Sequence, residues 1–173
     1  QHRRAIGILL KNWVVVIRSA LIGMFTGILP GAGGSIANIL SYDQAKKAAK
    51  DDSKFGKGDP RGIIAPEASN NAVEGGALTP LMALGIPGDI TAAIMLGALL
   101  MHDIVPGPTF IQDEPVLAYS IYIAFFLASF IMIGMQSGVL RVFVLVTRIK
   151  TYILATVILT FATIGVFALH NSI

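Results

Sequence analysis

Apolar residues along this chain fall into long runs, and two of these runs are interrupted by a Pro-Gly pair. The interruptions lie at residues 28–35 (ILPGAGGS) and 84–91 (LGIPGDIT). A broken helix inside a bilayer exposes backbone groups that hydrocarbon cannot satisfy, so a break persists there only beside other protein or a polar ligand. Two such breaks at similar motifs are typical of the corresponding halves of an inverted-repeat transporter.

Two uninterrupted runs, residues 116–138 and 152–169, carry no charged residue and predict transmembrane helices. The first break lies within residues 13–40, a segment with basic residues beyond both of its ends. Basic flanks mark the cytoplasmic side, so we predict a re-entrant hairpin here with its tip at Pro30-Gly31. Trp13 stands where an interfacial anchor is expected. Gly23 and Gly27 form a small-xxx-small pair that predicts close helix packing.

Residues 63–101 predict a polar-faced and broken helix. Glu67, Asn70, Asn71 and Glu74 recur at helical spacing and therefore share one face, with Pro66 suited to the first turn. That face is either wetted at the cytoplasmic surface or forms the wall of a substrate cavity. The apolar pieces 77–86 and 90–101 are each half a membrane crossing long, and together predict one crossing broken at the second Pro-Gly pair.

Charges in the loops indicate the topology of the chain. Residues 102–114 contain acidic residues but neither Lys nor Arg, which places this loop outside, whereas Arg141, Arg148 and Lys150 mark the cytoplasm. The predicted fold is therefore an all-α, multi-pass integral membrane protein. Its transmembrane helices include broken or re-entrant Pro-Gly segments, and it forms one part of an inverted-repeat secondary transporter.

Composition supports this fold class and excludes several functions. The chain is 54% hydrophobic and only 13% charged, about half the charged share of a soluble domain. It has no cysteine, and its three histidines lack carboxylates at ligand spacing, so no metal centre is expected. No basic cluster is interleaved with aromatic residues, which argues against nucleic-acid binding.

The breaks themselves offer groups for an anionic ligand. Glycines in the first turn permit positive φ and close approach of a ligand to the backbone, and Ser35 and Asp89 can cap the helices that restart there. The free N–H groups and dipoles of two such helices attract carboxylates, while carbonyls of the turns can ligate Na⁺. Asp89 acts either as a cap alone or as a cap and a cation or proton site. A tight loop at the membrane surface is the alternative interpretation of the first turn.

Two sets of candidate residues result. The residues predicted to bind substrate are Pro30, Gly31, Gly33, Gly34, Ser35, Asn70, Asn71, Pro87, Gly88 and Thr91. The residues predicted to couple a cation or proton are Asp89 and Glu67, with Na⁺ or H⁺ as the ion and no other cofactor.

Several motifs resemble the large membrane subunit of tripartite tricarboxylate transporters. They are residues 27–34 (GILPGAGG), 65–72 (APEASNNA), 75–78 (GGAL), 84–88 (LGIPG), 96–100 (LGALL), 106–108 (PGP) and 168–172 (ALHNS). The family's Pro-Gly motifs fall on Pro30-Gly31 and Pro87-Gly88, and its Asn pair on Asn70-Asn71. The family's large subunit is about three times longer, so the chain resembles a piece from its later part.

This resemblance implies a transporter in the bacterial inner membrane that imports citrate-like or other carboxylates, driven by an ion gradient. It also implies two protein partners, a smaller membrane subunit and a periplasmic substrate-binding protein. Two other classes remain. A structural or assembly subunit would use the glycine-rich segments only for packing, and a membrane enzyme would use Glu67 and Asp89 as acid and base. The chain lacks the nucleophile, the set of metal ligands and the cofactor motif that such an enzyme would need, so we expect no enzymatic activity.

Overall fold

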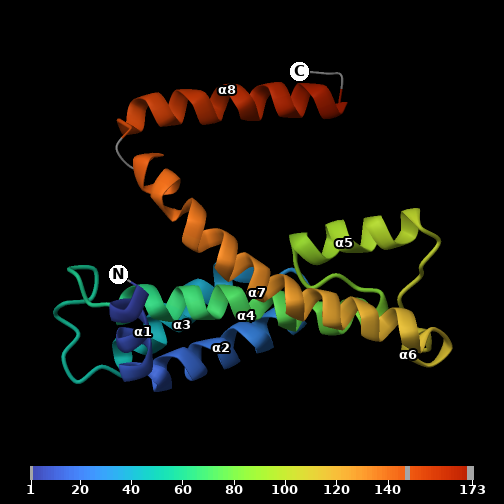
Figure 1. Cartoon of the computed structure of the whole chain (residues 1–173), viewed down its shortest axis with the longest axis horizontal. Coiled ribbons are helices and arrows are strands. Elements are labelled where there is room, and N and C mark those ends of the chain that lie inside the picture. Colours follow the sequence, from blue (N-terminus) through green and yellow to red (C-terminus); the bar gives the residue numbers. More distant parts are fainter. Residues whose placement is uncertain (1, 147–148, 171–173) are drawn as a thin grey trace. The chain divides into compact units, whose positions relative to one another are not determined.

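The computed structural model describes residues 2–146 and 149–170 and is all-helical over them, which confirms the predicted all-α class. The chain divides into two units, Gln1–Tyr119 and Ser120–Ile173. The helices (Figure 1) are α1 (His2–Lys11), α2 (Trp13–Ile28), α3 (Gly33–Lys47), α4 (Arg61–Leu84), α5 (Ile90–Met101), α6 (Phe110–Asp113), α7 (Pro115–Val146) and α8 (Thr151–His170). Arg148 and the end of the 168–172 motif, from position 171, lie outside the described residues.

The first unit is built on the packing of α2 against α4. The buried face of α2 consists of small residues, namely Ser19, Gly23, Thr26 and Gly27. A Cβ at Gly23 would overlap the carbonyl oxygen of Ser69, and one at Gly27 would overlap that of Val73. The two backbones therefore approach as closely as helices can, which confirms the predicted packing role of Gly23 and Gly27.

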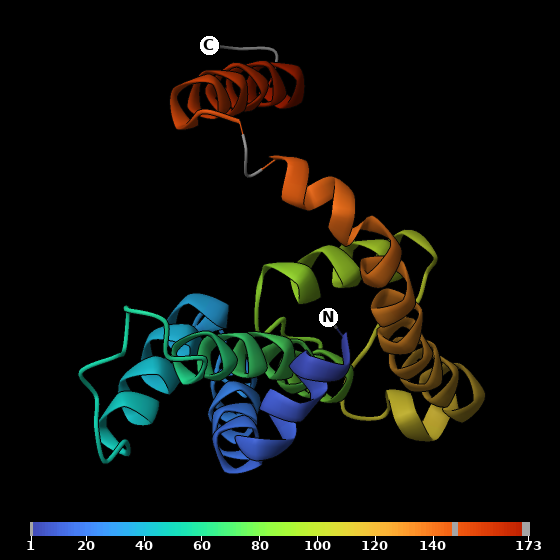
Figure 2. The same cartoon turned by 60° about the vertical axis from the view of Figure 1, so that its left-hand side comes forward.

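Helix α3 runs back alongside α2, and both pack on α4 (Figures 1 and 2). The first residues of α2 and the last residues of α3 meet in one small apolar cluster. Its members are Val15, Tyr42, Ala45, Ala49, Phe55 and Ala65. The chain thus reverses direction between α2 and α3, at residues 29–32, as a hairpin requires. That this hairpin is re-entrant in a membrane stays a prediction.

The loop between α3 and α4 is tied down at its end. Arg61 donates from Nε to Oδ1 of Asp59 at 3.0 Å and from Nη2 to Oδ2 at 2.6 Å. This pairing holds the pKa of the Asp59 carboxyl below its ordinary value. The guanidinium also lies 5.2 Å from the ring centre of Phe55, which is buried. Residues 55–60 form turns and no helix.

Helix α4 differs from the predicted pieces because it runs without interruption from Arg61 to Leu84, with Pro66 and Pro80 inside it. The prediction that Pro66 occupies the first turn is wrong, since the helix starts five residues earlier. There the Asp59 carboxylate accepts a hydrogen bond from the backbone N–H of Arg61 at 2.9 Å. The polar face and the apolar piece that follows it are thus one rigid element, which ends where Gly85 takes a left-handed conformation (φ 69°).

The loop predicted to lie outside, residues 102–114, contains the short helix α6. Phe110 and Pro106 are buried, and the carbonyl of Pro106 lies against Gly85, where an added Cβ would come within 2.7 Å of its oxygen. This loop therefore packs on the end of α4.

Within residues 2–146 and 149–170, two helices are long and apolar enough to cross a membrane, over Pro115–Leu140 and Thr151–Ala168. They confirm helices at the runs predicted for residues 116–138 and 152–169. Their large apolar side chains are exposed, for example Phe126 at 63% and Phe161 at 71%. A third span is available if α1 and α2, which meet at a bend of 78°, count as one.

Adjacent glycines on α4 provide a matched test of the α2–α4 packing. A Cβ at Gly76 would overlap the carbonyl oxygen of Met24, whereas one at Gly75 would meet no atom within 4 Å. We expect Gly76→Ala to lower the free energy of unfolding of the purified full-length protein by about 1–3 kcal/mol. Gly75→Ala should leave it unchanged or raise it by about 0.5–1 kcal/mol, because alanine favours a helix over glycine. Equal thermal midpoints for the two variants would contradict this packing.

Candidate substrate site at the two interrupted segments

The first interruption is a glycine turn between α2 and α3. Gly31 and Gly33 both have positive φ, 79° and 56°, the conformation that the glycines of this turn were predicted to permit. The prediction that Ser35 caps the helix is wrong. Helix α3 begins at Gly33, two residues before Ser35, and no side chain caps it. Ser35 therefore lies in the first turn of α3, where it still lines the cavity described below.

The second interruption separates α4 from α5. Asp89 has extended backbone angles, and its Oδ1 accepts a hydrogen bond from the N–H of Ala92 at 2.8 Å. This confirms Asp89 as the N-cap of α5. A carboxylate in this position satisfies a free N–H group and also opposes the positive end of the helix dipole.

The two interruptions meet. The backbone N–H of Gly31 donates a hydrogen bond to the carbonyl oxygen of Gly88 at 3.2 Å. Gly88 is buried, and a Cβ there would overlap the carbonyl oxygen of Gly27 and come within 2.9 Å of Ala77. The second segment is therefore held against both α2 and α4, and only a glycine fits at its centre.

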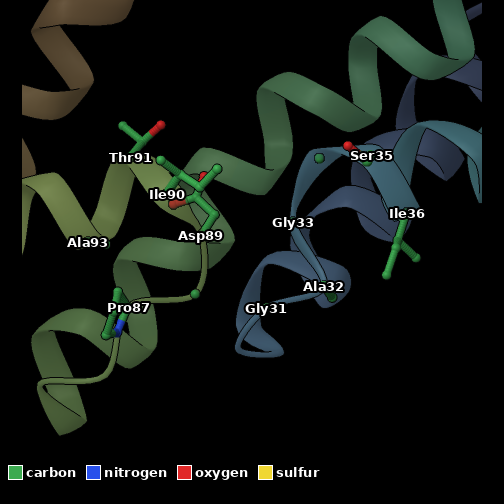
Figure 3. A pocket seen from close by; sticks show the side chains of 12 residues that line it. Gly31, Ala32, Gly33, Ser35, Ile36, Pro87, Asp89, Ile90, Thr91 and Ala93 are labelled. Atoms are coloured by element: carbon green, nitrogen blue, oxygen red, sulfur yellow. The ribbon is translucent and has the colours of Figure 1, made fainter. Parts of the chain in front are cut away.

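A cavity of about 640 Å³ lies between the two segments (Figure 3). One side is the glycine turn and first turn of α3, and the other is Pro87 to Thr91 with the start of α5. Both helices therefore begin at this cavity, with their free N–H groups beside it. Among the described residues that line it, Asp89 is the only one with an ionisable side chain. Positive potential for an anion thus comes from the helix N-termini and not from Lys or Arg.

The polar face of α4 adjoins both segments. Asn70 lies beside Gly34, where an added Cβ would come within 2.5 Å of its Oδ1. Glu74 accepts a hydrogen bond from the hydroxyl of Thr91 at 3.5 Å. The face therefore extends from the first interruption to the second, and Gly34, which does not have a positive φ, leaves room for the Asn70 side chain.

The other two polar residues of this face bond to one another. The amide of Asn71 donates to the backbone oxygen of Glu67 at 2.9 Å and to its Oε1 at 3.4 Å, and both residues are exposed. Like Asn70 and Glu74, they are not among the residues that line the 640 Å³ cavity. Their predicted roles in binding and coupling stay predictions.

Glu74 was not among the residues predicted from the sequence to bind substrate or to couple an ion. Its spacing assigned it to the polar face, but only the fold brings it to Thr91 at the start of α5, near the Asp89 carboxylate. No group of three or more His, Cys, Asp or Glu side chains in the described part of the chain is arranged to hold a metal ion.

The architecture is that of a membrane protein, with helices long and apolar enough to span and a cavity where two pairs of helices are interrupted. The chain belongs to the tripartite tricarboxylate transporter TctA family, which matches residues 2–173. Membership confirms the resemblance drawn from the motifs.

Two proteins of Agrobacterium vitis are similar to this chain. The uncharacterized 52.8 kDa protein in the TAR-I ttuC' 3' region is 31% identical over 91% of this chain and 31% of its own length. The uncharacterized protein in the TAR-II ttuC' 3' region is 31% identical over 87% of this chain and 62% of its own length. The chain thus spans about a third of the first relative and about three fifths of the second. No solved structure matches it.

Substitution of Gly88 tests whether contact between the two segments matters for transport. We expect Gly88→Ala in the full-length protein to reduce transport by about 10- to 100-fold, because the added methyl forces the segment away from Gly27 and Gly31. Gly97→Ala on α5 is the matched control, since its Cβ would meet nothing within 4 Å. Both variants should reach the membrane. Full transport by Gly88→Ala would show that the contact is dispensable.

Proposed function

We propose that the full-length protein takes up tricarboxylates or related carboxylates across the bacterial inner membrane, driven by a gradient of Na⁺ or H⁺. Its partners would be a small membrane subunit and a periplasmic substrate-binding protein, as expected of a tripartite system. The observation that carries this proposal is the hydrogen bond between Gly31 and Gly88, which brings two helix N-termini to one cavity.

The cavity favours an anion with several carboxylates. Each helix start offers backbone N–H groups and the positive end of a dipole, and two starts on opposite sides of one space can bind two carboxylates of the same molecule. Its volume of about 640 Å³ falls in the range of small-molecule sites. Ser35 and Thr91 add hydroxyl donors, and Asn70 adds an amide beside the first turn.

The acidic residues at the second interruption provide the reason for ion coupling. Asp89 lies in the cavity wall, and Glu74 is held near it by Thr91. Two carboxylates repel an anionic substrate unless a cation or proton neutralises them. Substrate and ion would then enter together, since each lowers the electrostatic cost of the other. The same argument gives Asp89 a role beyond capping α5.

A structural or assembly subunit is the second candidate, and the tight packing of glycines between α2 and α4 favours it. In that case the glycines at the interruptions would serve only to bring helices together. The cavity and the exposed Asn70 beside it are unnecessary for such a role.

Uptake by the full-length complex in vesicles tests the proposed function. With a Na⁺ or H⁺ gradient, wild type should accumulate at least one member of a radiolabelled panel of di- and tricarboxylates. Asn70→Ala should reduce this uptake by about tenfold, the typical effect of losing one hydrogen bond to a charged group. Asn71→Ala tests the neighbouring amide, which is also predicted to bind substrate but bonds within its own helix, and should reduce uptake less. If the intact complex transports no carboxylate, the transport proposal is wrong and the structural or assembly role remains.

Asp89→Asn separates the capping role from ion coupling. Asparagine caps a helix about as well as aspartate, so α5 should stay folded and the thermal midpoint should change little. Uptake driven by an ion gradient should nevertheless be lost, because the charge that the ion neutralises is gone. Asp89→Ala, which removes both properties, should also lower the midpoint. If uptake by the Asp89→Asn variant depends on the ion gradient as it does in wild type, Asp89 only caps α5 and does not couple the ion.

A further inference from the structure

Helix α1 separates charged and apolar side chains onto different faces. Arg4, Gly7 and Lys11 follow one another at helical spacing on one side, whereas Ile6, Leu9 and Leu10 form an apolar face. Arg3 falls beside Leu10, at the boundary between the two. This division is typical of helices that lie in the plane of a membrane surface.

The apolar face of α1 is not covered by the rest of the protein. Ile6 is 55% exposed, Leu9 46% and Leu10 69%. The helix instead contacts its surroundings on the side of Ile8 and Asn12, which are half-buried. The face with the large aliphatic side chains is therefore available to a partner.

The geometry of the bend indicates which partner this is. Helix α1 meets α2 at 78°, and the Asn12 side chain donates to the carbonyl oxygen of Ile8 at 2.8 Å at the corner. With α2 directed into a membrane, α1 lies close to the membrane plane. Three cationic residues exclude α1 from the hydrocarbon interior, and Trp13, 60% exposed, begins α2 at the depth where tryptophan is favoured.

The charge around α1 completes the argument. Lys11 lines a cleft of about 430 Å³ between α1 and the end of the loop that precedes α4, together with Arg61 and its ion-pair partner Asp59. That loop and the last turn of α3 carry lysines at positions 46, 47, 50, 54 and 57 and aspartates at 51, 52 and 59, so residues 46–61 keep a net positive charge. A net positive surface beside an amphipathic helix is complementary to a negatively charged one.

We propose that α1 is an interfacial helix that binds the anionic phospholipid surface of the membrane. Leu9, Leu10 and Ile6 enter the boundary between headgroups and acyl chains, while Arg4 and Lys11 contact lipid phosphates. This places the corner at Asn12 at the membrane surface and fixes the depth at which α2 enters. The proposal depends on insertion of α2 in a membrane but not on which substrate is transported.

Site-specific labels on the full-length protein in lipid nanodiscs test this proposal. The chain itself contains no cysteine, so Leu9→Cys and Gly7→Cys label the two faces separately, against a cysteine-free background in the rest of the protein. In nanodiscs of phosphatidylcholine with phosphatidylglycerol, a spin label at position 9 should collide several-fold more with a lipid-soluble relaxation agent than a label at position 7. A water-soluble agent should give the opposite order.

Charge removal tests the anionic lipid directly. Arg4→Gln with Lys11→Gln should weaken the surface association by about fivefold per charge and move the label at position 9 toward water. Nanodiscs of pure phosphatidylcholine should move the same label toward water in the protein that keeps Arg4 and Lys11. The proposal is overturned if position 9 is shielded from both agents, since a protein then covers this face. It is also overturned if position 9 is as exposed to water as position 7, or if lipid charge has no effect.

Discussion

The fold of the first unit depends on a backbone contact that only glycine permits. Gly23 and Gly27 on α2 and Gly76 on α4 let the two helices touch without side chains between them. Gly88 then fits against Gly27 and Ala77, and this fit places its carbonyl within hydrogen-bond reach of Gly31. A methyl group at any of the four would overlap a backbone atom. The candidate site is thus a consequence of helix packing.

The same contact explains how an anion site can form without cationic side chains. Two helices start at one place because their preceding turns are held together, and their free N–H groups come to the cavity from both sides. A Lys or Arg inside a membrane costs several kcal/mol, on the order of 2.5–3.5 on insertion scales. Backbone dipoles carry no such cost. The negative charge of Asp89, the N-cap of α5, weakens the positive potential of these dipoles. In the function we propose, this links substrate binding to an ion that neutralises Asp89.

Much of this architecture could be predicted from the sequence, because it depends on local rules. Charge-free runs predicted the helices α7 and α8, the Gly-xxx-Gly spacing predicted the packing of α2, and Asp89 was recognised as a cap. The errors were also local. Ser35 was assigned as a cap because hydroxyls usually occupy that position, yet α3 starts at Gly33, two residues before it. The continuous course of α4 was missed because its polarity changes midway, and polarity does not end a helix.

Relations between segments could not be read from the sequence. The pairing of Gly31 with Gly88, the approach of Asn70 to Gly34 and the position of Glu74 at Thr91 join residues that lie far apart along the chain. Spacing along a helix predicts which side chains share a face, but it does not predict what that face meets. The prediction that both interruptions belong to one site was based on their similarity, whereas the structure supplies a hydrogen bond between them.

Hydrogen–deuterium exchange of the full-length complex, with and without a transported carboxylate, tests most directly whether the two interruptions form one site. The amides at the start of α3, near Gly34, and at the start of α5, near Thr91, should both become slower to exchange when substrate binds. The middle of α5 should not change. Protection at only one of the two helix starts, or at neither while substrate is bound, would contradict a shared site.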